Sequence, residues 1–122
     1  MIKNIYKTSL SLLTDLYQLT MAYGYWKKGI HNNIASFNVF FRENPFSSGY
    51  AVSSGLENII SFLENFKFSK SDLDYLQSLK TDNGSNLFSR EFIDFLSQIK
   101  FECDVYAIAV SYTHLTLPTT GV

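Results

Sequence analysis

The chain has 122 residues, enough for about one domain with a single hydrophobic core. Hydrophobic residues make up 46% of the chain and charged residues 17%, a composition that disfavours intrinsic disorder. Ten lysines and arginines stand against eleven aspartates and glutamates, and the net charge of −1 disfavours binding to nucleic acid or to a membrane through basic residues.

The same composition limits metal, redox and membrane chemistry. A single cysteine, Cys103, excludes an intrachain disulfide and a multi-cysteine metal site. His31 and His114 lie far apart and lack the spacing to other ligands that a metal site needs, so no metal is predicted. No apolar run reaches the ~18 residues of a membrane helix. Residues 1–13 do not resemble a signal peptide, so a cytoplasmic protein is expected.

The first predicted element is a helix that begins after Thr14 and ends before Gly29. Glycine suits the left-handed position just beyond a helix, and the lysines at 27 and 28 suit its negative C-terminal end. Apolar residues three and four apart predict the stripe that faces the core, which consists of Leu16, Leu19, Tyr23 and Trp26.

Alternating side chains then predict a strand over residues 34–42. One of its faces carries Ala35, Phe37, Val39 and Phe41, and the other face is more polar. The dipeptide Asn44-Pro45 ends this strand, and residues 50–53 predict a short second strand.

Three further helices and a last strand complete the predicted order. Gly55 opens a helix, Ser69 with Asp72 forms a capping box for the next one, and Ser89 caps the third. Residues 101–108 alternate and predict a strand. The order predicts an α+β or α/β fold, of which α+β is preferred. The first of these helices is expected to bury Leu56, Ile59, Ile60 and Leu63.

Two features outside the apolar stripes could carry chemistry. Asp15 and Tyr17 lie in the first turn of the first helix, where the helix dipole favours a carboxylate. Tyr17 is about 100° away from Leu16 around the helix. Its ring could stack on a flat ligand, pack against a partner or lie on the surface.

Arg42 is the second feature, because it closes the aromatic strand on its polar side. A guanidinium there offers a planar fork for phosphate or carboxylate, and the alternative is a surface ion pair with Glu43. The sequence contains neither GxxxxGK[ST] nor GxGxxG, so no phosphate-binding loop of those kinds is predicted.

Three stretches, LLTDLYQLTMAYGYWKKG, FNVFFRENPF and GYAVSSGLENIISFLENF, occur in this order and spacing. Together they resemble the N-terminal segment of nicotinate phosphoribosyltransferase. The resemblance runs from about Leu12 to Ile108 and covers only the first part of a much longer protein. It implies an N-terminal domain over residues 1–108 that lacks the family's C-terminal α/β barrel. Residues 109–122 have no counterpart and are expected to be a disordered or foreign tail.

The resemblance also implies an activity and a site. The family joins nicotinate to the ribosyl group of 5-phosphoribosyl 1-pyrophosphate, with ATP hydrolysis and Mg²⁺, as the entry step of NAD synthesis from nicotinate. It implies that Tyr17 stacks on the nicotinate ring, that Asp15 lies beside it, and that Arg42 is near the donor's phosphates. It further implies a homodimer of the full enzyme.

The missing barrel carries the phosphate loops and the histidine that is phosphorylated. We therefore expect no catalytic residue in this chain, no ATP or Mg²⁺ bound by it and no catalysis by it alone. Two alternatives stay open. The chain could be a non-catalytic module that binds a partner through its aromatic side chains, or a non-functional truncation product.

Overall fold

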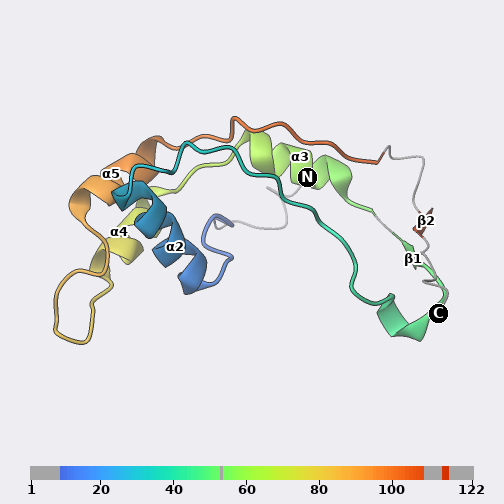
Figure 1. Ribbon diagram of the computed structural model, residues 1–122, viewed down its shortest axis with the longest axis horizontal. Helices are drawn as coiled ribbons and strands as arrows, with labels where there is room; N and C mark the ends of the chain where they lie inside the picture. The colour runs from blue at the N-terminus through green and yellow to red at the C-terminus, as the bar shows by residue number, and fades with distance from the viewer. Residues whose placement is uncertain (1–8, 53, 109–113, 116–122) are drawn as a thin grey trace.

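The computed structural model describes residues 9–52, 54–108 and 114–115 (Figure 1). Helices α2 (Leu16–Lys27), α4 (Lys70–Ser78) and α5 (Arg90–Gln98) gather at one end of the molecule. Helix α3 (Leu56–Glu64) lies further along, and the opposite end holds a 3₁₀ turn, η1 (Pro45–Ser47), with two short strands. Among the described residues, no helix has the length and apolar character to cross a membrane.

The predicted start and stop signals of the helices are largely confirmed. Helix α2 has Asp15 as its N-cap, one residue after the expected Thr14. Gly29, beyond its C-terminal end, adopts φ +69°, which is the left-handed conformation that glycine tolerates. Gly55 also has a positive φ, +88°, immediately before α3. Ser89 caps α5 by accepting a hydrogen bond from the Phe92 amide.

The core lies between α4 and α5 and is covered by one face of α2. Phe92 is 1% exposed, and its ring centroid is 4.8 Å from that of Tyr23 and 5.5 Å from that of Trp26. These ring contacts attach α2 to α5 and confirm most of the predicted stripe of α2. Leu16, at the start of the stripe, is exposed instead. The buried residues of the core are Leu76, Phe88, Phe92, Ile93 and Leu96.

A second connection joins α2 to the start of α5. The pKa of Tyr23 is lowered, mainly by a hydrogen bond to the Ser89 side chain. The Ser89 backbone and the positive charge of Lys27 lower this pKa further, whereas burial raises it. The Lys27 ammonium also lies 5.0 Å from the centre of the Tyr23 ring. Tyr23 therefore contributes both its ring and its hydroxyl to the contact between the helices.

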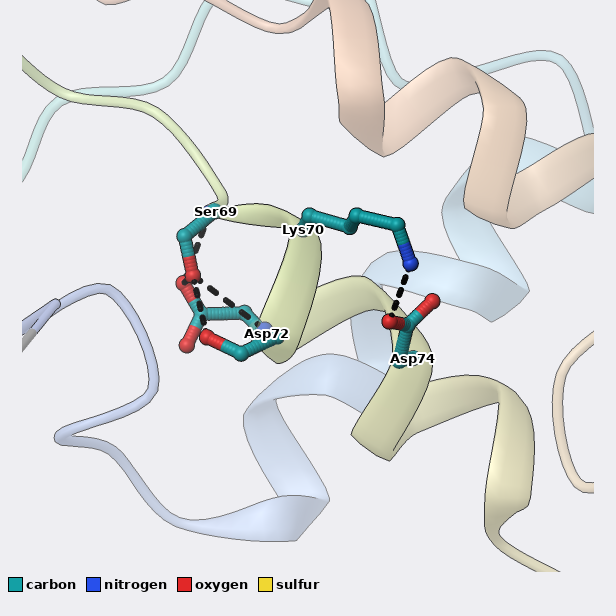
Figure 2. A network of polar contacts seen from close by, with 5 residues as sticks. Ser69, Lys70, Asp72 and Asp74 are labelled. Atoms are coloured by element: carbon teal, nitrogen blue, oxygen red, sulfur yellow. Dashed lines mark hydrogen bonds and ion pairs between the residues drawn. The ribbon is translucent and has the colours of Figure 1, made fainter.

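The capping box at the start of α4 forms as predicted (Figure 2). Asp72 Oδ2 accepts hydrogen bonds from the Ser69 amide and hydroxyl, both at 2.7 Å, and the Asp72 amide donates to the Ser69 hydroxyl. Burial raises the pKa of Asp72, but hydrogen bonds from the Ser69 side chain, the Ser9 side chain and the Ser69 backbone outweigh it and leave the pKa lowered. The ionised carboxylate therefore holds the first turn of α4 together.

The strands predicted over residues 34–42 and 101–108 are wrong. Both stretches cross the molecule as drawn-out chain (Figure 1), and they form no backbone hydrogen bond with any described residue. Side-chain alternation predicts which face of a strand is apolar, but a strand also needs a partner for its amides and carbonyls. Helices are accordingly the main regular structure of the described fold, which has far less strand than an α+β domain of the predicted order.

The second short strand is confirmed as β1 (Ala51–Val52), which lies inside the predicted range 50–53; residue 53 is outside the described residues. Strand β1 pairs antiparallel with β2 (His114–Leu115), with Ala51 opposite Leu115. The predicted tail spans residues 109–122, of which only His114 and Leu115 are described. The prediction that this tail is disordered therefore concerns residues outside the described part of the chain. A further backbone bridge joins Lys80 and Asn86 across the predicted turn.

The predicted buried stripe of α3 is also wrong. Ile59 is 52% exposed and Ile60 44%, and α3 contains no buried residue. The spacing correctly places the apolar side chains on one face of α3. No residue of α3 is among those that pack against the buried core, and α3 lies apart from the cluster of α2, α4 and α5 (Figure 1).

We predict that Phe92→Ala lowers the free energy of unfolding by about 3–5 kcal/mol, because it removes a fully buried ring from the centre of the core. Urea unfolding followed by circular dichroism measures this loss. The matched control is Phe37→Ala, because Phe37 is 91% exposed and its loss should change stability little. Equal losses in the two variants would show that the core lies elsewhere. If the alanine variant does not fold, Phe92→Leu should still be measurably destabilised.

We predict that Asp72→Asn costs about 0.5–2 kcal/mol at neutral pH, the range for the loss of a helix cap. The folded-state pKa of Asp72 lies below the ordinary value of 3.8. Its contribution to stability is therefore complete above that value and is lost as the pH falls through the lower folded-state pKa. The difference between wild type and variant should shrink in that acid range. Asp74→Asn, which removes an exposed i, i+4 ion pair with Lys70, is the control and should cost much less.

Candidate functional site

Asp15, the N-cap of α2, has a side-chain carboxylate that makes no capping hydrogen bond. Asp15 has an extended backbone, with φ −77° and ψ 146°, and its carbonyl accepts a hydrogen bond from the Gln18 amide. Its side chain makes no capping hydrogen bond, although an N-cap aspartate commonly makes one. The carboxylate is exposed at the positive end of the helix dipole and is available to solvent or a ligand.

Tyr17 lies in the same turn and faces away from the core. Its side chain is 59% exposed, whereas Tyr23 and Trp26 in the same helix pack against Phe92. Helix α2 therefore has one aromatic face in the core, and two further tyrosines, Tyr17 and Tyr25, have exposed side chains. The exposed ring of Tyr17 could accept a flat partner on its face.

An open depression adjoins this turn. It is lined by Leu12, Leu13, Thr14, Asp15 and Gln18. Leu12 also packs against the core, so one side of the depression is fixed by the folded part of the chain. Tyr17 is not among the lining residues. The structure thus brings Asp15 and Tyr17 into one turn, and Asp15 is one of the residues that line the depression.

Arg42 is placed away from this turn. Its residue is exposed and forms no ion pair with Glu43 or with any other described residue. Figure 1 shows that η1, which begins at Pro45 soon after Arg42, lies at the opposite end of the molecule from α2. The structure therefore does not bring Arg42 to Asp15 and Tyr17. The roles that the resemblance implies for the three residues stay predictions.

One feature near Arg42 was missed by the sequence analysis. Phe46 and Ser47 both adopt a left-handed backbone, with φ 58° and 54°, and Phe46 is fully exposed. Such a conformation in a bulky residue is strained and more often found where a segment has a function. The Asn44-Pro45 dipeptide predicted a turn here, but no sequence signal identifies phenylalanine as the residue that adopts this conformation.

The histidine and acidic residues give no metal centre in the described part of the chain. No three of its histidine, cysteine, aspartate and glutamate side chains are grouped closely enough to hold an ion. The His31 ring lies with its edge toward Phe95, at 5.2 Å between ring centroids. His31 therefore contributes to packing at the end of α5.

Comparison with known proteins identifies the family. Residues 12–121 match the family described as nicotinate phosphoribosyltransferase (NAPRTase) N-terminal domain. A nicotinate phosphoribosyltransferase of Bacillus subtilis is 62% identical over 69 residues, which are 57% of this chain and 14% of that protein. One from Caenorhabditis elegans is 49% identical over 88 residues, covering 72% of this chain and 15% of the relative. Nicotinate phosphoribosyltransferase 2 of Arabidopsis thaliana is 42% identical over 98 residues, which are 80% of this chain and 17% of that protein.

The chain spans less than a fifth of the length of each of these relatives. The family match, in contrast, covers nearly the whole chain and includes the turn that carries Asp15 and Tyr17, the segment that carries Arg42 and all of the helical core. The resemblance inferred from the three sequence stretches is confirmed. The chain belongs to the nicotinate phosphoribosyltransferase N-terminal domain family.

Proposed function

We propose that this chain is the N-terminal part of an enzyme that transfers the phosphoribosyl group of 5-phosphoribosyl 1-pyrophosphate to nicotinate. The observation that carries the proposal is the family match over residues 12–121, supported by relatives of that name with up to 62% identity. In the reaction, the pyridine nitrogen bonds to the anomeric carbon of the ribose while the bond from that carbon to pyrophosphate breaks. The products are nicotinate mononucleotide and pyrophosphate.

In this proposal the first turn of α2 contributes to the nicotinate site. The exposed Tyr17 ring stacks on the flat pyridine ring, which restricts the orientation of the nucleophilic nitrogen. Asp15, in the same turn, lies at the edge of the site with a side chain that the cap does not use. Because Tyr17 is not needed in the core, its ring can bind a ligand without weakening the fold.

Arg42 is proposed to bind the phosphates of the ribosyl donor. Its guanidinium has no carboxylate partner among the described residues, and a planar fork of donors suits phosphate oxygens. Arg42 precedes η1 by three residues, and η1 lies at the opposite end of the molecule from α2 (Figure 1). The two groups would therefore act in one site only if another subunit or the remainder of a longer protein brings them together. This geometry agrees with the proposal that the full enzyme is a homodimer.

ATP hydrolysis and Mg²⁺ are proposed to be coupled to the reaction of the full-length enzyme. The described residues offer no group of acidic or histidine side chains that fits a Mg²⁺ ion. The proposal therefore assigns the ATP and Mg²⁺ sites to the remainder of a longer protein. It gives this chain a role in substrate binding and no step of the chemistry.

We predict that the 122-residue chain alone forms no nicotinate mononucleotide from nicotinate, the ribosyl donor, ATP and Mg²⁺. Phosphoribosyl transfer depends on positioned groups that stabilise the departing pyrophosphate, and the chain spans only 14% of the Bacillus subtilis relative. Product is measured by liquid chromatography with mass detection. The full-length Bacillus subtilis relative is the positive control. Turnover above a no-protein blank would contradict the prediction.

The role of Tyr17 can be tested in a chimaera, in which this chain's residues replace the matching stretch of the Bacillus subtilis relative. We predict that Tyr17→Ala raises the nicotinate KM by roughly 5- to 150-fold, equivalent to about 1–3 kcal/mol of lost stacking. Tyr17→Phe is the matched control, because it keeps the aromatic face, and its effect should be small. The KM of the ribosyl donor should change less than that of nicotinate.

A purely structural role for Tyr17 predicts a different result. In that case Tyr17→Ala would lower the melting temperature of the chimaera and leave the nicotinate KM of the folded enzyme unchanged. Measuring both quantities on the same protein separates the two roles. A normal KM would remove Tyr17 from the proposed site.

A second function, partner binding by a non-catalytic module, is favoured by one observation. Aromatic side chains outside the core are largely exposed, including Phe37, Phe40, Phe46 and Tyr106. Such an apolar surface is unusual for a monomer and typical of an interface. A folded chain that binds another protein through these aromatic side chains, and binds neither nicotinate nor the ribosyl donor, would support this function over the first.

A further inference from the structure

The loop between α4 and α5 contains an asparagine followed by a glycine, Asn83 and Gly84. No other asparagine of the chain precedes a glycine. The amide nitrogen of a glycine is poorly shielded, because glycine has no side chain. Both residues are exposed, and a Cβ atom built on Gly84 would meet no heavy atom within 4 Å other than those of its chain neighbours. Water and hydroxide can therefore reach this amide.

The side chain of Asn83 is folded back over the peptide group that follows it. Its Oδ1 accepts a hydrogen bond of 3.1 Å from the Ser85 amide, which is the pattern of an Asx turn. The Thr81 hydroxyl donates a second hydrogen bond to the same oxygen. An Asx turn keeps the side-chain carbonyl carbon next to the amide nitrogen of the following residue, which here is Gly84. The carbon therefore has a nucleophilic atom beside it, and its oxygen has two donors.

We propose that Asn83 is a site of spontaneous deamidation, in which Thr81 and Ser85 position and activate its side-chain carbonyl. Hydroxide removes the proton of the Gly84 amide, and the amide nitrogen forms a bond with Cγ of Asn83. The bond from Cγ to the side-chain nitrogen then breaks, and this nitrogen takes a proton from water and leaves as ammonia. Water opens the resulting succinimide ring at either carbonyl, which gives aspartate or isoaspartate at position 83.

The two hydrogen bonds on Asn83 Oδ1 favour the attack. Negative charge develops on this oxygen as the nitrogen bonds to Cγ, and hydrogen bonds to a charged oxygen are stronger than those to a neutral one. A further hydrogen bond opposes the reaction, because the Gly84 amide donates to the Thr81 carbonyl at 2.9 Å and must release it first. That bond lies in an exposed turn, where local opening costs little free energy. The balance therefore favours attack at Asn83.

Deamidation would change the connection between α4 and α5. Both products add a negative charge to the chain's net charge of −1, and isoaspartate also lengthens the main chain by one carbon atom before Gly84. The turn is closed by backbone hydrogen bonds of 2.9 Å from the Gly84 amide to Thr81 and from the Thr81 amide to Ser85, and the longer chain would misplace them. Phe88, which is 0% exposed, follows the turn directly. Isoaspartate at position 83 should therefore loosen the core.

Ageing of the full chain in mildly alkaline buffer tests the site. Trypsin cleaves after Lys80 and Arg90, so the peptide 81–90 contains Asn83 together with Asn86, an exposed asparagine that precedes leucine. Peptide mass spectrometry should find deamidation and isoaspartate at Asn83 and at most a trace at Asn86. The aged chain should also melt at a lower temperature than the fresh chain. Asn83→Gln is the control, because glutamine would have to close a larger ring, and ageing should not change its melting temperature.

A matched pair of variants tests the role of the Thr81 hydroxyl. Thr81→Val removes the hydroxyl and keeps the shape of the side chain, whereas Thr81→Ser keeps the hydroxyl. In the folded chain, we expect Thr81→Val to slow deamidation of Asn83 roughly two- to tenfold, the effect of one hydrogen bond. Thr81→Ser should react at the rate of wild type. In urea that unfolds the chain, all three proteins should react at the same rate, because the turn is then absent.

Several results would overturn the proposal. Equal rates at Asn83 and Asn86 in the folded wild type would show that the turn creates no site. A folded Thr81→Val chain that reacts as fast as wild type, or faster, would remove the hydroxyl from the reaction. A difference between Thr81→Val and wild type that persists in urea would assign the effect to the local sequence and not to the turn. None of these measurements uses a substrate, so their failure would leave the proposed enzymatic role unchanged.

Discussion

The packing of Phe92 against Tyr23 and Trp26 is the contact on which the rest of the described fold depends. It joins α2, near the start of the chain, to α5, more than sixty residues later. Phe92 also contacts the rings of Phe88 and Phe95, so it lies at the centre of the aromatic packing. Because α2 carries Asp15 and Tyr17 on its first turn, the position of the candidate site relative to the fold is set by this contact. A change in the core would therefore move the site, whereas a change at the exposed Tyr17 ring would leave the core intact.

Local signals in the sequence predicted the helices well, because each signal acts within a few residues of the place where it is needed. Ser69 with Asp72, Ser89 before α5, and Gly29 after α2 all have the predicted geometry. The strands over residues 34–42 and 101–108 were not predicted correctly, although the alternation that suggested them is real. An alternating pattern reports that one face of a segment should be covered, and it carries no information about which other segment provides the hydrogen bonds. The same limit explains α3, whose apolar face is present and exposed.

For the candidate site, the sequence predicted the placement of Tyr17 off the buried stripe, because the angular position of a residue on a helix follows directly from its number. The roles of Tyr17, Asp15 and Arg42 come from the resemblance and not from the pattern. The distance between Arg42 and α2 could not be predicted, since it depends on the course of the chain between Gly29 and Pro45, where no regular element fixes the direction. The left-handed backbone of Phe46 belongs to the same stretch and has the same lack of local signal.

The two kinds of result, a confirmed helical cluster and unpaired apolar segments, have one physical explanation. The cluster of α2, α4 and α5 closes on itself, since its buried side chains find their partners within residues 12–99. Residues 34–41 and the face of α3 have the apolar character of a core without the partners that would make one. Burial of apolar surface is the main favourable term in folding and in association, so covering these side chains would stabilise the structure. The enzymatic proposal leaves this surface to be covered by another subunit or by the remainder of a longer protein. Under that proposal, the same covering part would bring Arg42 and the first turn of α2 into one site.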